Sequence, residues 1–390
     1  MNLLSNLNRV LAFVWLVIIG TSVSDYYSEE APYQGLVILA GAAYFLFLFY
    51  RQFLRLIFFE DYLLVLFVYV VPIALMVLSH RSFERSAYVS HIAFVLVFVV
   101  ASVLALRREL NGSLVCATFT IVAIGTVLNL YELFVEHNTW STAPGRSAGW
   151  YINPNISSGA LVGYGLATLS ARLGKLRTID LILMILVMVG VFTTFSRSGI
   201  LASLVLVCAA ILVRARRDDA RRIIVAGVGV ALVFFMFAGY VFLYLDLSLD
   251  AALRIESLLN SGGVGDYEGG RGYAAENALK LITEDLISGA GVGTVSQMEE
   301  GPHNMFVAVL VDYGAIGLMV YLFVIVRLAL IACRADRTVS GPIWLYLGWL
   351  TIFGFASHNL MSESPTIPLM GFALARAYTI QSRKSIDDVV

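Results

Sequence analysis

A succession of twelve apolar segments occupies most of the chain, and the length of these segments limits the possible folds more than any other feature. A helix needs about 20 mostly apolar residues to cross the hydrocarbon core of a bilayer. Because the backbone in lipid has to satisfy its own hydrogen bonds, such segments predict transmembrane α-helices. The predicted spans are 10–24, 33–50, 61–79, 87–106, 112–136, 153–171, 178–195, 198–213, 223–245, 303–326, 341–357 and 365–380.

The composition excludes a soluble globular protein. Hydrophobic residues make up 59% of the 390 residues, charged residues make up 14%, and the mean hydropathy is +0.84. Soluble domains are about 45–50% apolar. Cys116, Cys208 and Cys333 lie far apart in or beside apolar segments, which indicates neither a disulfide framework nor a zinc site. We therefore expect an all-α, polytopic membrane protein with about twelve transmembrane helices, formed by residues 1–390 as a single integral membrane domain.

The basic residues predict the orientation of these helices. If the first segment starts on the inner side and the helices alternate, the outer side receives Arg81, Arg85, Arg146, Arg197, Arg254, Arg271 and Lys280, and the other 19 of the 26 basic residues lie inside. Since inner loops of membrane proteins are enriched in lysine and arginine, both termini are expected to be cytoplasmic. The sequence after Ile19 is a weak cleavage site, so we expect the first helix to be retained.

The longest segment without a predicted span is residues 246–302, between the ninth and tenth spans. It would form a large outer loop. Within it, Ala275, Ala278, Leu279, Ile282 and Leu286 recur at helical spacing, which predicts an amphipathic helix on the membrane surface or against the helix bundle. The glycine-rich residues 289–293 follow this helix and no strand, so they do not indicate a nucleotide site.

Two outer arginines are candidates for binding an anion. Arg146 lies among glycines before Asn153-Pro154-Asn155, where an asparagine is expected to cap the sixth span and proline suits its first turn. Arg146 could bind an anionic substrate, a lipid headgroup or a carboxylate. Arg197 lies in a very short predicted turn between the seventh and eighth spans. An unpaired charge is costly there, so a salt bridge to an acidic loop and an anionic substrate group are both candidates for its partner.

Two His-Asn pairs lie at the outer ends of predicted spans. His303-Asn304 follows Pro302 at the start of the tenth span, and His358-Asn359 lies at the end of the eleventh. Histidine can accept a proton from a hydroxyl group near neutral pH, although an isolated interfacial histidine is more often structural. We expect His303 to act at the outer surface, with His358 as a second polar contact.

These residues resemble the superfamily of O-antigen ligases and polysaccharide polymerases. The resemblance depends on Arg146 and Gly149, on Asn153-Pro154-Asn155, on Ser196-Arg197-Ser198-Gly199, on Arg271 with Gly289-Ala290-Gly291, and on Pro302-His303-Asn304 with Asp312-Tyr313-Gly314-Ala315-Ile316-Gly317. It extends over about the second two-thirds of the chain. Asp312 occupies a position where the resemblance leads us to expect glutamate.

The resemblance implies a glycosyltransferase of the bacterial inner membrane with a periplasmic active site. Such proteins move a glycan from an undecaprenyl-diphosphate carrier to a hydroxyl group of the lipid A core or of another glycan. His303 and Arg271 would be catalytic, and Arg197, Arg146, Asn304 and His358 would bind substrate. Guanidinium groups suit paired phosphate oxygens, so neither a metal nor a cofactor is expected. The implied partners are the lipid-linked donor, the acceptor and membrane lipid, without nucleic acid.

Three other functions were considered. A polysaccharide transporter or flippase should place ionisable groups or broken helices near the membrane midplane in repeated halves, which the sequence does not clearly do. Another type of glycosyltransferase would bind a metal through the first outer loop, at Asp25, Glu29 and Glu30. A purely structural role would not explain why a few arginines lie on the outer side.

Overall fold

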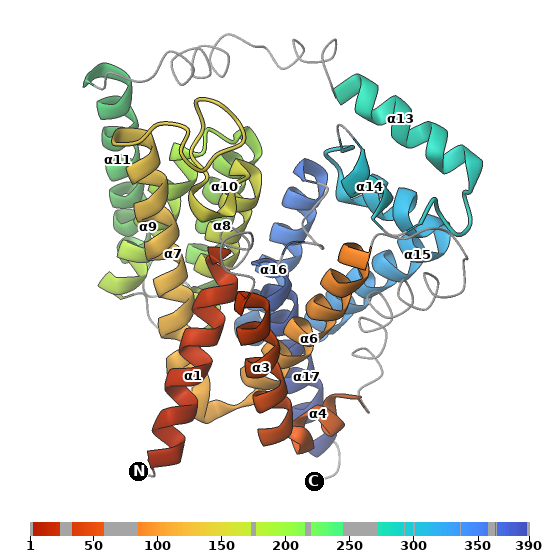
Figure 1. Ribbon diagram of the computed structural model, residues 1–390. Coiled ribbons are helices and arrows are strands. Elements are labelled where there is room, and N and C mark those ends of the chain that lie inside the picture. The colour runs from red at the N-terminus through yellow and green to blue at the C-terminus, as the bar shows by residue number, and fades with distance from the viewer. Residues whose placement is uncertain are drawn as a thin grey trace. The chain divides into compact units, whose positions relative to one another are not determined.

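The computed structural model describes residues 3–23, 33–57, 85–172, 177–214, 220–244, 271–291, 293–298, 301–335, 337–357, 363 and 365–387. Within these ranges the protein is all-α and contains no strand (Figure 1). The helices are α1 (Leu3–Gly20), α3 (Tyr33–Leu48), α4 (Tyr50–Ile57), α6 (Arg85–Leu106), η1 (Arg108–Leu110), α7 (Asn111–Phe134), η2 (Gly149–Tyr151), α8 (Pro154–Ala171), α9 (Thr178–Thr193), α10 (Arg197–Arg214), α11 (Ala220–Tyr244), α13 (Arg271–Glu284), α14 (Thr294–Gln297), α15 (Met305–Cys333), α16 (Arg337–Ala356) and α17 (Ile367–Asp387).

A long helix covers every predicted span except 61–79, which lies outside the described residues. The described part of the chain has two helices that are long and apolar enough to cross a membrane, Arg108–Phe134 and Met305–Cys333. There are up to three if Leu36–Leu48 and Tyr50–Leu56, which are bent by 84° relative to each other, form one span. The all-α class is thus confirmed, and the count of twelve spans stays a prediction.

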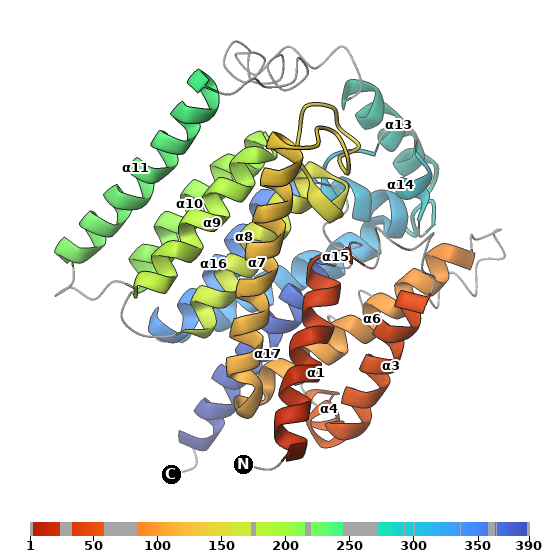
Figure 2. The same cartoon turned by 60° about the vertical axis from the view of Figure 1, so that its left-hand side comes forward.

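The chain divides into two compact units, and the prediction of a single membrane domain is not tested by this division. Unit 1 contains Met1–Ile38, Arg107–Asn260 and Ala335–Phe353, and unit 2 contains Leu39–Leu106, Ser261–Arg334 and Gly354–Val390. Within unit 1, α7 packs against α1, α8 and α9, and α10 packs against α8 and α9 (Figure 2). Within unit 2, α6 packs against α17, and α15 contacts α13, α14 and α17.

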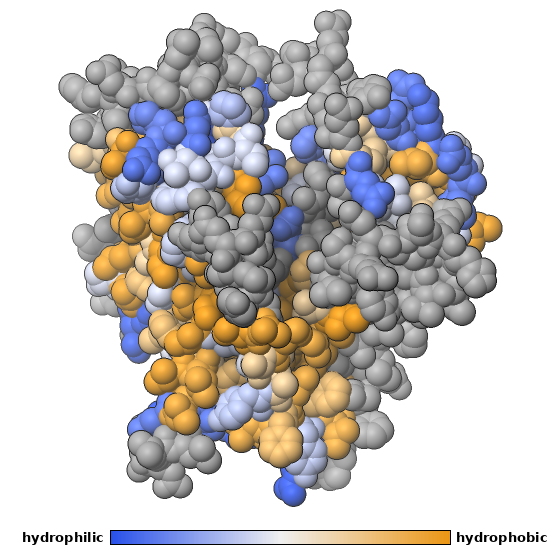
Figure 3. Space-filling view, viewed as in Figure 1, coloured by the Kyte–Doolittle hydropathy of each residue, from blue (hydrophilic) through white to orange (hydrophobic). Residues whose placement is uncertain are grey.

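Many side chains on the outward faces of these helices are large and apolar. Phe47 is 85% exposed, Met236 is 73% exposed and Phe355 is 62% exposed. Apolar residues also cover wide areas of the face shown in Figure 3, with polar residues gathered at the ends of helices. Contiguous apolar surface of this kind is typical of a protein that faces lipid.

The short turn between the seventh and eighth predicted spans is confirmed. Helix α9 ends at Thr193 and α10 begins at Arg197, so the segment is not one long helix. Phe195 has a φ of +45° and is fully buried, which lets the chain reverse within three residues. Thr194 and Phe195 donate backbone hydrogen bonds to the last turn of α9. The turn places Arg197 at the first position of α10.

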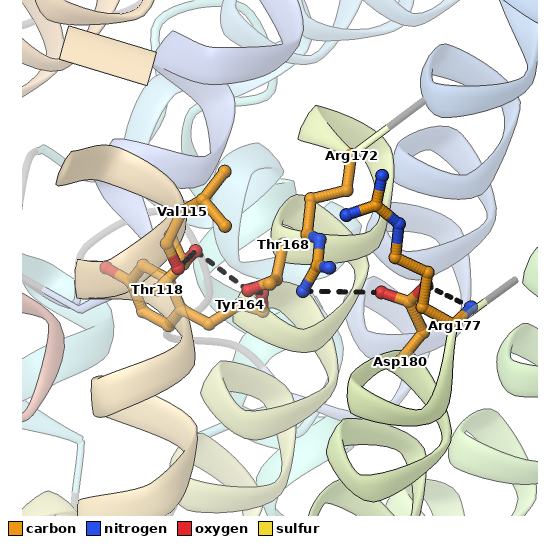
Figure 4. Close-up of polar contacts among 7 residues, drawn as sticks. All are labelled: Val115, Thr118, Tyr164, Thr168, Arg172, Arg177 and Asp180. Carbon is orange, nitrogen blue, oxygen red and sulfur yellow. Dashed lines mark hydrogen bonds and ion pairs between the residues drawn. The ribbon is translucent and has the colours of Figure 1, made fainter. Parts of the chain in front are cut away.

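A buried carboxylate connects the C-terminal end of α8 to the N-terminal end of α9 (Figure 4). Asp180 is fully buried in the first turn of α9 and accepts a 2.9 Å hydrogen bond from the backbone N–H of Arg177. The guanidinium of Arg172, at the end of α8, lies 3.6 Å from the other carboxylate oxygen. Nearby, the Thr168 hydroxyl donates to the Thr118 hydroxyl at 2.7 Å and connects α8 to α7. These contacts fix the register of three helices.

Candidate active site

A buried glutamate organises the loop between α7 and α8. Glu132 is 2% exposed and lies in the last turn of α7. One carboxylate oxygen accepts hydrogen bonds from the backbone N–H groups of Trp140 and Ser141, at 2.8 and 2.6 Å. The other accepts from Ala148 and Gly149, at 2.7 and 2.9 Å. Four charge-assisted bonds to one side chain give this irregular loop a defined backbone.

The sequence did not predict this function of Glu132. A single carboxylate near the end of an apolar segment does not reveal which backbone groups it will meet. Only the position of Glu132 could have indicated its role. An unpaired carboxylate in an apolar helix is costly, so a carboxylate at this position is expected to have hydrogen-bond partners. The loop also requires glycine at position 149, because Gly149 has a φ of +55° and a Cβ atom there would lie 3.0 Å from the side chain of Leu128.

The same loop holds Arg146 in a fixed orientation. The Nε atom of Arg146 donates to the backbone carbonyl of Thr194 at 2.9 Å, and Nη2 donates to the side-chain oxygen of Asn155 at 2.9 Å. Ser147 adds a backbone hydrogen bond to the carbonyl of Thr193 at 3.2 Å. The Arg146 loop is thereby attached both to the start of α8 and to the turn between α9 and α10.

Asn155 joins three of the segments that the sequence singled out. Its Oδ1 atom accepts from Arg146 and also from the Ser196 hydroxyl, at 2.9 Å. Asn153 is the N-cap of α8, accepting from the Asn155 backbone N–H at 2.9 Å, with Pro154 in the first turn. The predicted cap is therefore confirmed as Asn153, and Asn155 is the residue that contacts the arginine.

Arg197 begins α10 directly after this junction, and its side chain is exposed. Its neighbours are held closely: Gly199 donates its backbone N–H to the Ser196 hydroxyl at 3.3 Å, and a Cβ atom on Gly199 would lie 2.7 Å from Ser158. The structure thus brings Arg146, Asn155 and the residues beside Arg197 together at one end of unit 1. We call this group the arginine junction.

The second group of predicted residues lies in unit 2, where α15 begins. Asn304 is the N-cap of α15, and its side-chain oxygen accepts from the backbone N–H groups of Phe306 and Val307 at 2.9 and 3.3 Å. His303 directly precedes the cap, is partly exposed and has a φ of +44°. The left-handed conformation is uncommon for a residue with a Cβ atom, so the backbone around His303 is specifically constrained.

Helix α15 is broken shortly after its start, which the sequence did not predict. Gly314 has a φ of +66° and interrupts the helical backbone. The Ala315 N–H donates to the Leu286 carbonyl at 2.8 Å, and the Val311 carbonyl accepts from the Ala290 N–H at 2.7 Å. Residues 286–290 therefore satisfy the backbone groups that the break in α15 would otherwise leave without helical partners.

Two glycines allow this close approach of the two segments. A Cβ atom on Gly314 would lie 2.2 Å from the Ile287 carbonyl oxygen, and one on Gly289, whose φ is +77°, would lie 2.5 Å from the Gly314 nitrogen. The two motifs Gly289-Ala290-Gly291 and Asp312-Tyr313-Gly314, which the sequence presented separately, are thus packed backbone to backbone. We call this contact the glycine contact.

Asp312 extends this contact to the short helix α14. Its carboxylate oxygens accept from the backbone N–H groups of Val295 at 3.0 Å and Gly293 at 3.3 Å. A carboxylate at a helix N-terminus satisfies free N–H groups and interacts favourably with the helix dipole. Asp312 thus holds the start of α14, whose last residue, Gln297, precedes His303 in the sequence.

The predicted loop helix exists as α13, but its inward face differs from the predicted stripe. Ala274 is buried, and Ala278 and Ile282 are buried in a cluster with Val295, Ala308 and Val311. Leu279 and Leu286 are 60% and 54% exposed, and the helix ends at Glu284. The predicted stripe is thus confirmed at Ala278 and Ile282 and wrong at Leu279, while Leu281, which lay outside the stripe, packs against the same cluster.

The remaining predicted residues are described only in part. Arg271 is the first residue of α13, and its side chain lies outside the description. His358 also lies outside the described residues. Arg146 and Arg197 belong to unit 1, whereas Arg271, His303 and Asn304 belong to unit 2. The described ranges contain no group of three or more His, Cys, Asp or Glu side chains that could hold a metal ion.

Part of the chain matches a known family. Residues 182–322 match the family model described as O-antigen ligase. The match includes Arg197, Arg271, His303 and the glycine contact, whereas Arg146 precedes it. The predicted resemblance to the O-antigen ligase superfamily is confirmed. The match supports a membrane protein with a glycosyltransferase-like function.

The chain also has a weak similarity to a solved structure. A solved structure titled "Structural coordination of polymerization and crosslinking by a peptidoglycan synthase complex" is 16% identical, with a TM-score of 0.43, and the alignment covers 81% of this chain and 97% of that chain. This similarity is too low to carry an argument about function. No curated protein matches the chain.

Proposed function

We propose that this protein transfers a glycan from an undecaprenyl-diphosphate carrier to an acceptor hydroxyl group on the periplasmic face of the membrane. The acceptor is either the lipid A core, as for a ligase, or a growing glycan, as for a polymerase. The proposal rests on the O-antigen ligase match together with the arginine junction. The observation that carries it is the double hydrogen bonding of Arg146 to Thr194 and Asn155, which orients a guanidinium against the turn that precedes Arg197.

The proposed chemistry depends on the charge of the leaving group. When the bond between the sugar and the diphosphate breaks, negative charge grows on the phosphate oxygens, and pre-oriented cations stabilise that charge in the transition state. Arg146 and Arg197 are suited to this role because guanidinium groups stay charged and bind paired oxygens. We assign the same function to Arg271, which lies within residues 182–322, the range matched by the family model.

His303 is proposed to take the proton of the acceptor hydroxyl group or to orient that group. A neutral imidazole can accept a proton near neutral pH. The constrained backbone at His303 and the cap at Asn304 would hold the imidazole in one direction. Since the donor already carries a good leaving group, orientation of the acceptor could supply much of the acceleration without a strong base.

The test uses the full-length protein in detergent micelles, where transport between two compartments cannot occur. The purified protein is given a polyprenyl-diphosphate glycan and an acceptor glycolipid, and product is separated on a gel. We expect transfer by the natural protein and loss of transfer in Arg197→Ala and Arg271→Ala. Normal transfer by Arg271→Ala would remove that residue from the site. Absence of transfer by a folded natural protein, with carrier movement in vesicles, would establish the flippase alternative.

A further inference from the structure

A groove lies at the end of unit 1 where α1 and α7 begin. Its volume is about 540 Å³, and its lining residues come from α1, from η1 and from the first turns of α7: Arg9, Val10, Phe13, Arg108, Glu109, Gly112, Ser113 and Cys116. None of these residues belongs to the arginine junction or to the segment matched by the family model. The proposed transfer reaction therefore does not explain this groove.

The charged side of the groove is suited to an anion. Arg9 is held at the rim by a 3.1 Å hydrogen bond from Nε to the Glu109 carbonyl oxygen, and Arg108 is exposed beside it. The Glu109 carboxylate forms an ion pair with Arg107, so its charge is compensated. Two arginines, Arg9 and Arg108, bring positive charge to the lining. Their planar N–H donors match phosphate oxygens.

The start of α7 adds to this positive potential. The helix begins at Asn111 after the N-cap Leu110, and no side chain caps it by a hydrogen bond. Gly112 and Ser113 lie in this first turn and line the groove. The preceding turn η1 runs directly into α7, and the backbone N–H of Asn111 donates to the Arg108 carbonyl. The positive end of the helix dipole at this point favours an anionic group. A Cβ atom on Gly112 would meet nothing within 4 Å, so there is open space directly at this turn.

The other side of the groove is apolar and faces outward. Val10 is 57% exposed, Phe13 is partly exposed, and Cys116 is exposed one helical turn beyond Gly112. In a helix that contacts lipid, such residues lie against acyl chains. An inorganic phosphate would gain nothing from this apolar wall, and a zwitterionic lipid would bring its own cation to the arginines. A ligand with both a phosphate and acyl chains satisfies both sides of the groove.

We propose that this groove is a binding site for an anionic phospholipid. The phosphodiester of the lipid binds Arg9, Arg108 and the first turn of α7, and the acyl chains lie along Val10 and Phe13. Basic grooves beside helix ends are general sites for anionic headgroups, with about 1 kcal/mol per arginine or lysine near the surface. The site would attach the protein to a specific lipid independently of the glycan reaction.

Cys116 provides a direct test of occupancy, because its thiol lines the groove. The full-length protein with Cys208→Ser and Cys333→Ser carries one reactive thiol, and its reaction with a water-soluble maleimide is followed in micelles of a nonionic detergent. Phosphatidylglycerol, phosphatidylcholine or inorganic phosphate is then added. We expect phosphatidylglycerol to slow the modification several-fold in a saturable way, and the other two to leave the rate unchanged.

Variants test whether the arginines and the open space produce the effect. In Arg108→Gln, the amount of phosphatidylglycerol needed for half of the protection should rise about fivefold. Gly112→Trp should fill the groove and remove the dependence on lipid, whereas Gly112→Ala should preserve it. A protein with Cys208 as its only cysteine measures any general effect of micelle charge. Thermal unfolding followed by tryptophan fluorescence shows that each variant is folded.

Four results would overturn the proposal. Equal protection by phosphatidylcholine would make the groove a general lipid contact. Equal protection by inorganic phosphate would make it an ion site without a role for the acyl chains. Unchanged half-protection in Arg108→Gln, or the same slowing at Cys208, would show that the groove does not recognise the lipid.

Discussion

At the scale of single residues, the Arg146 guanidinium is oriented by two neutral oxygen atoms, those of Thr194 and Asn155. Arg146→Lys keeps the charge and loses the planar arrangement of donors that reaches both oxygens. We expect Arg146→Lys and Arg146→Ala both to reduce the rate of glycan transfer, by about 100-fold as for other charge-stabilising donors. The rate is measured in detergent with a polyprenyl-diphosphate donor.

Arg51→Lys is the matched control for this substitution. Arg51 is exposed on α4 and lies outside both groups of candidate site residues. The transfer rate of Arg51→Lys should equal that of the natural protein. If Arg146→Lys also keeps the full rate, orientation of the guanidinium is not required, and Arg146 supplies charge alone.

Glu132 provides a test of stability at the same scale. In Glu132→Gln, one of the two acceptor oxygens becomes an NH₂ group and faces backbone N–H donors, which leaves buried groups unsatisfied. We expect the free energy of unfolding to fall by about 2 kcal/mol or more. Thermal unfolding followed by tryptophan fluorescence measures the change, and Glu136→Gln, at an exposed position of the same loop, should leave the midpoint unchanged.

His303 requires a substitution that separates backbone from side chain. Because its φ is +44°, His303→Ala removes the imidazole and also strains the backbone, whereas asparagine tolerates this conformation. We expect both His303→Ala and His303→Asn to lose glycan transfer while membrane insertion stays normal. Full activity of His303→Asn would show that the imidazole neither accepts a proton nor positions the acceptor.

At the scale of helices, the glycine contact predicts that alanine is destabilising at Gly314 and Gly289, whereas alanine is tolerated at a glycine with open space around it. Alanine at Gly314 places Cβ 2.2 Å from the Ile287 carbonyl oxygen, and alanine at Gly289 meets the Gly314 nitrogen at 2.5 Å. Both substitutions also force an L-residue to adopt a positive φ, which costs about 1–2 kcal/mol before any clash. We expect a lower unfolding temperature and loss of transfer in each variant.

Gly229→Ala is the control for these variants, since a Cβ atom there would meet nothing within 4 Å inside α11. Alanine is favoured over glycine in helices, so this variant should be as stable as the natural protein or slightly more stable. A Gly314→Ala variant with normal stability would show that α15 can become a continuous helix without its contact to residues 286–290.

The helices themselves were largely predictable, because a span of apolar residues leaves the backbone few alternatives in lipid. The turn at Phe195 and the cap at Asn153 also followed from the sequence, since local residue types decide both. The break at Gly314 did not follow, because its backbone partners lie more than 20 residues earlier in the chain. The buried face of α13 was predicted only in part, at Ala278 and Ile282, because contacts with α15 decide which of its residues are buried.

The candidate site was predictable in its residue types but not in its construction. Arg146 and the Ser196-Arg197 turn were singled out by sparse outer charge, and Asn155 connects them through an amide oxygen that no spacing rule reveals. Glu132 was missed because its four partners are backbone groups of an irregular loop. Irregular backbone depends on the sum of many contacts, whereas helices depend on local pattern.

At the scale of the whole molecule, the role of metal ions separates two types of glycosyltransferase. If arginines alone stabilise the diphosphate, transfer should continue at an unchanged rate after dialysis against a chelator of divalent cations. Loss of activity, with recovery on addition of Mg²⁺ or Mn²⁺, would favour a metal site at Asp25, Glu29 and Glu30, which lie outside the described residues. A transfer assay before and after chelation is sufficient.

The Glu132 loop also has a consequence for how the protein is made. All four partners of the carboxylate lie 8 to 17 residues after it, so this loop can close as soon as the chain from α7 to Gly149 has left the ribosome. The Thr194 carbonyl that orients Arg146 follows 48 residues after that arginine, beyond two further helices. The loop can therefore form early in synthesis, whereas its arginine reaches its final orientation only after α9 and the turn that follows it have been made.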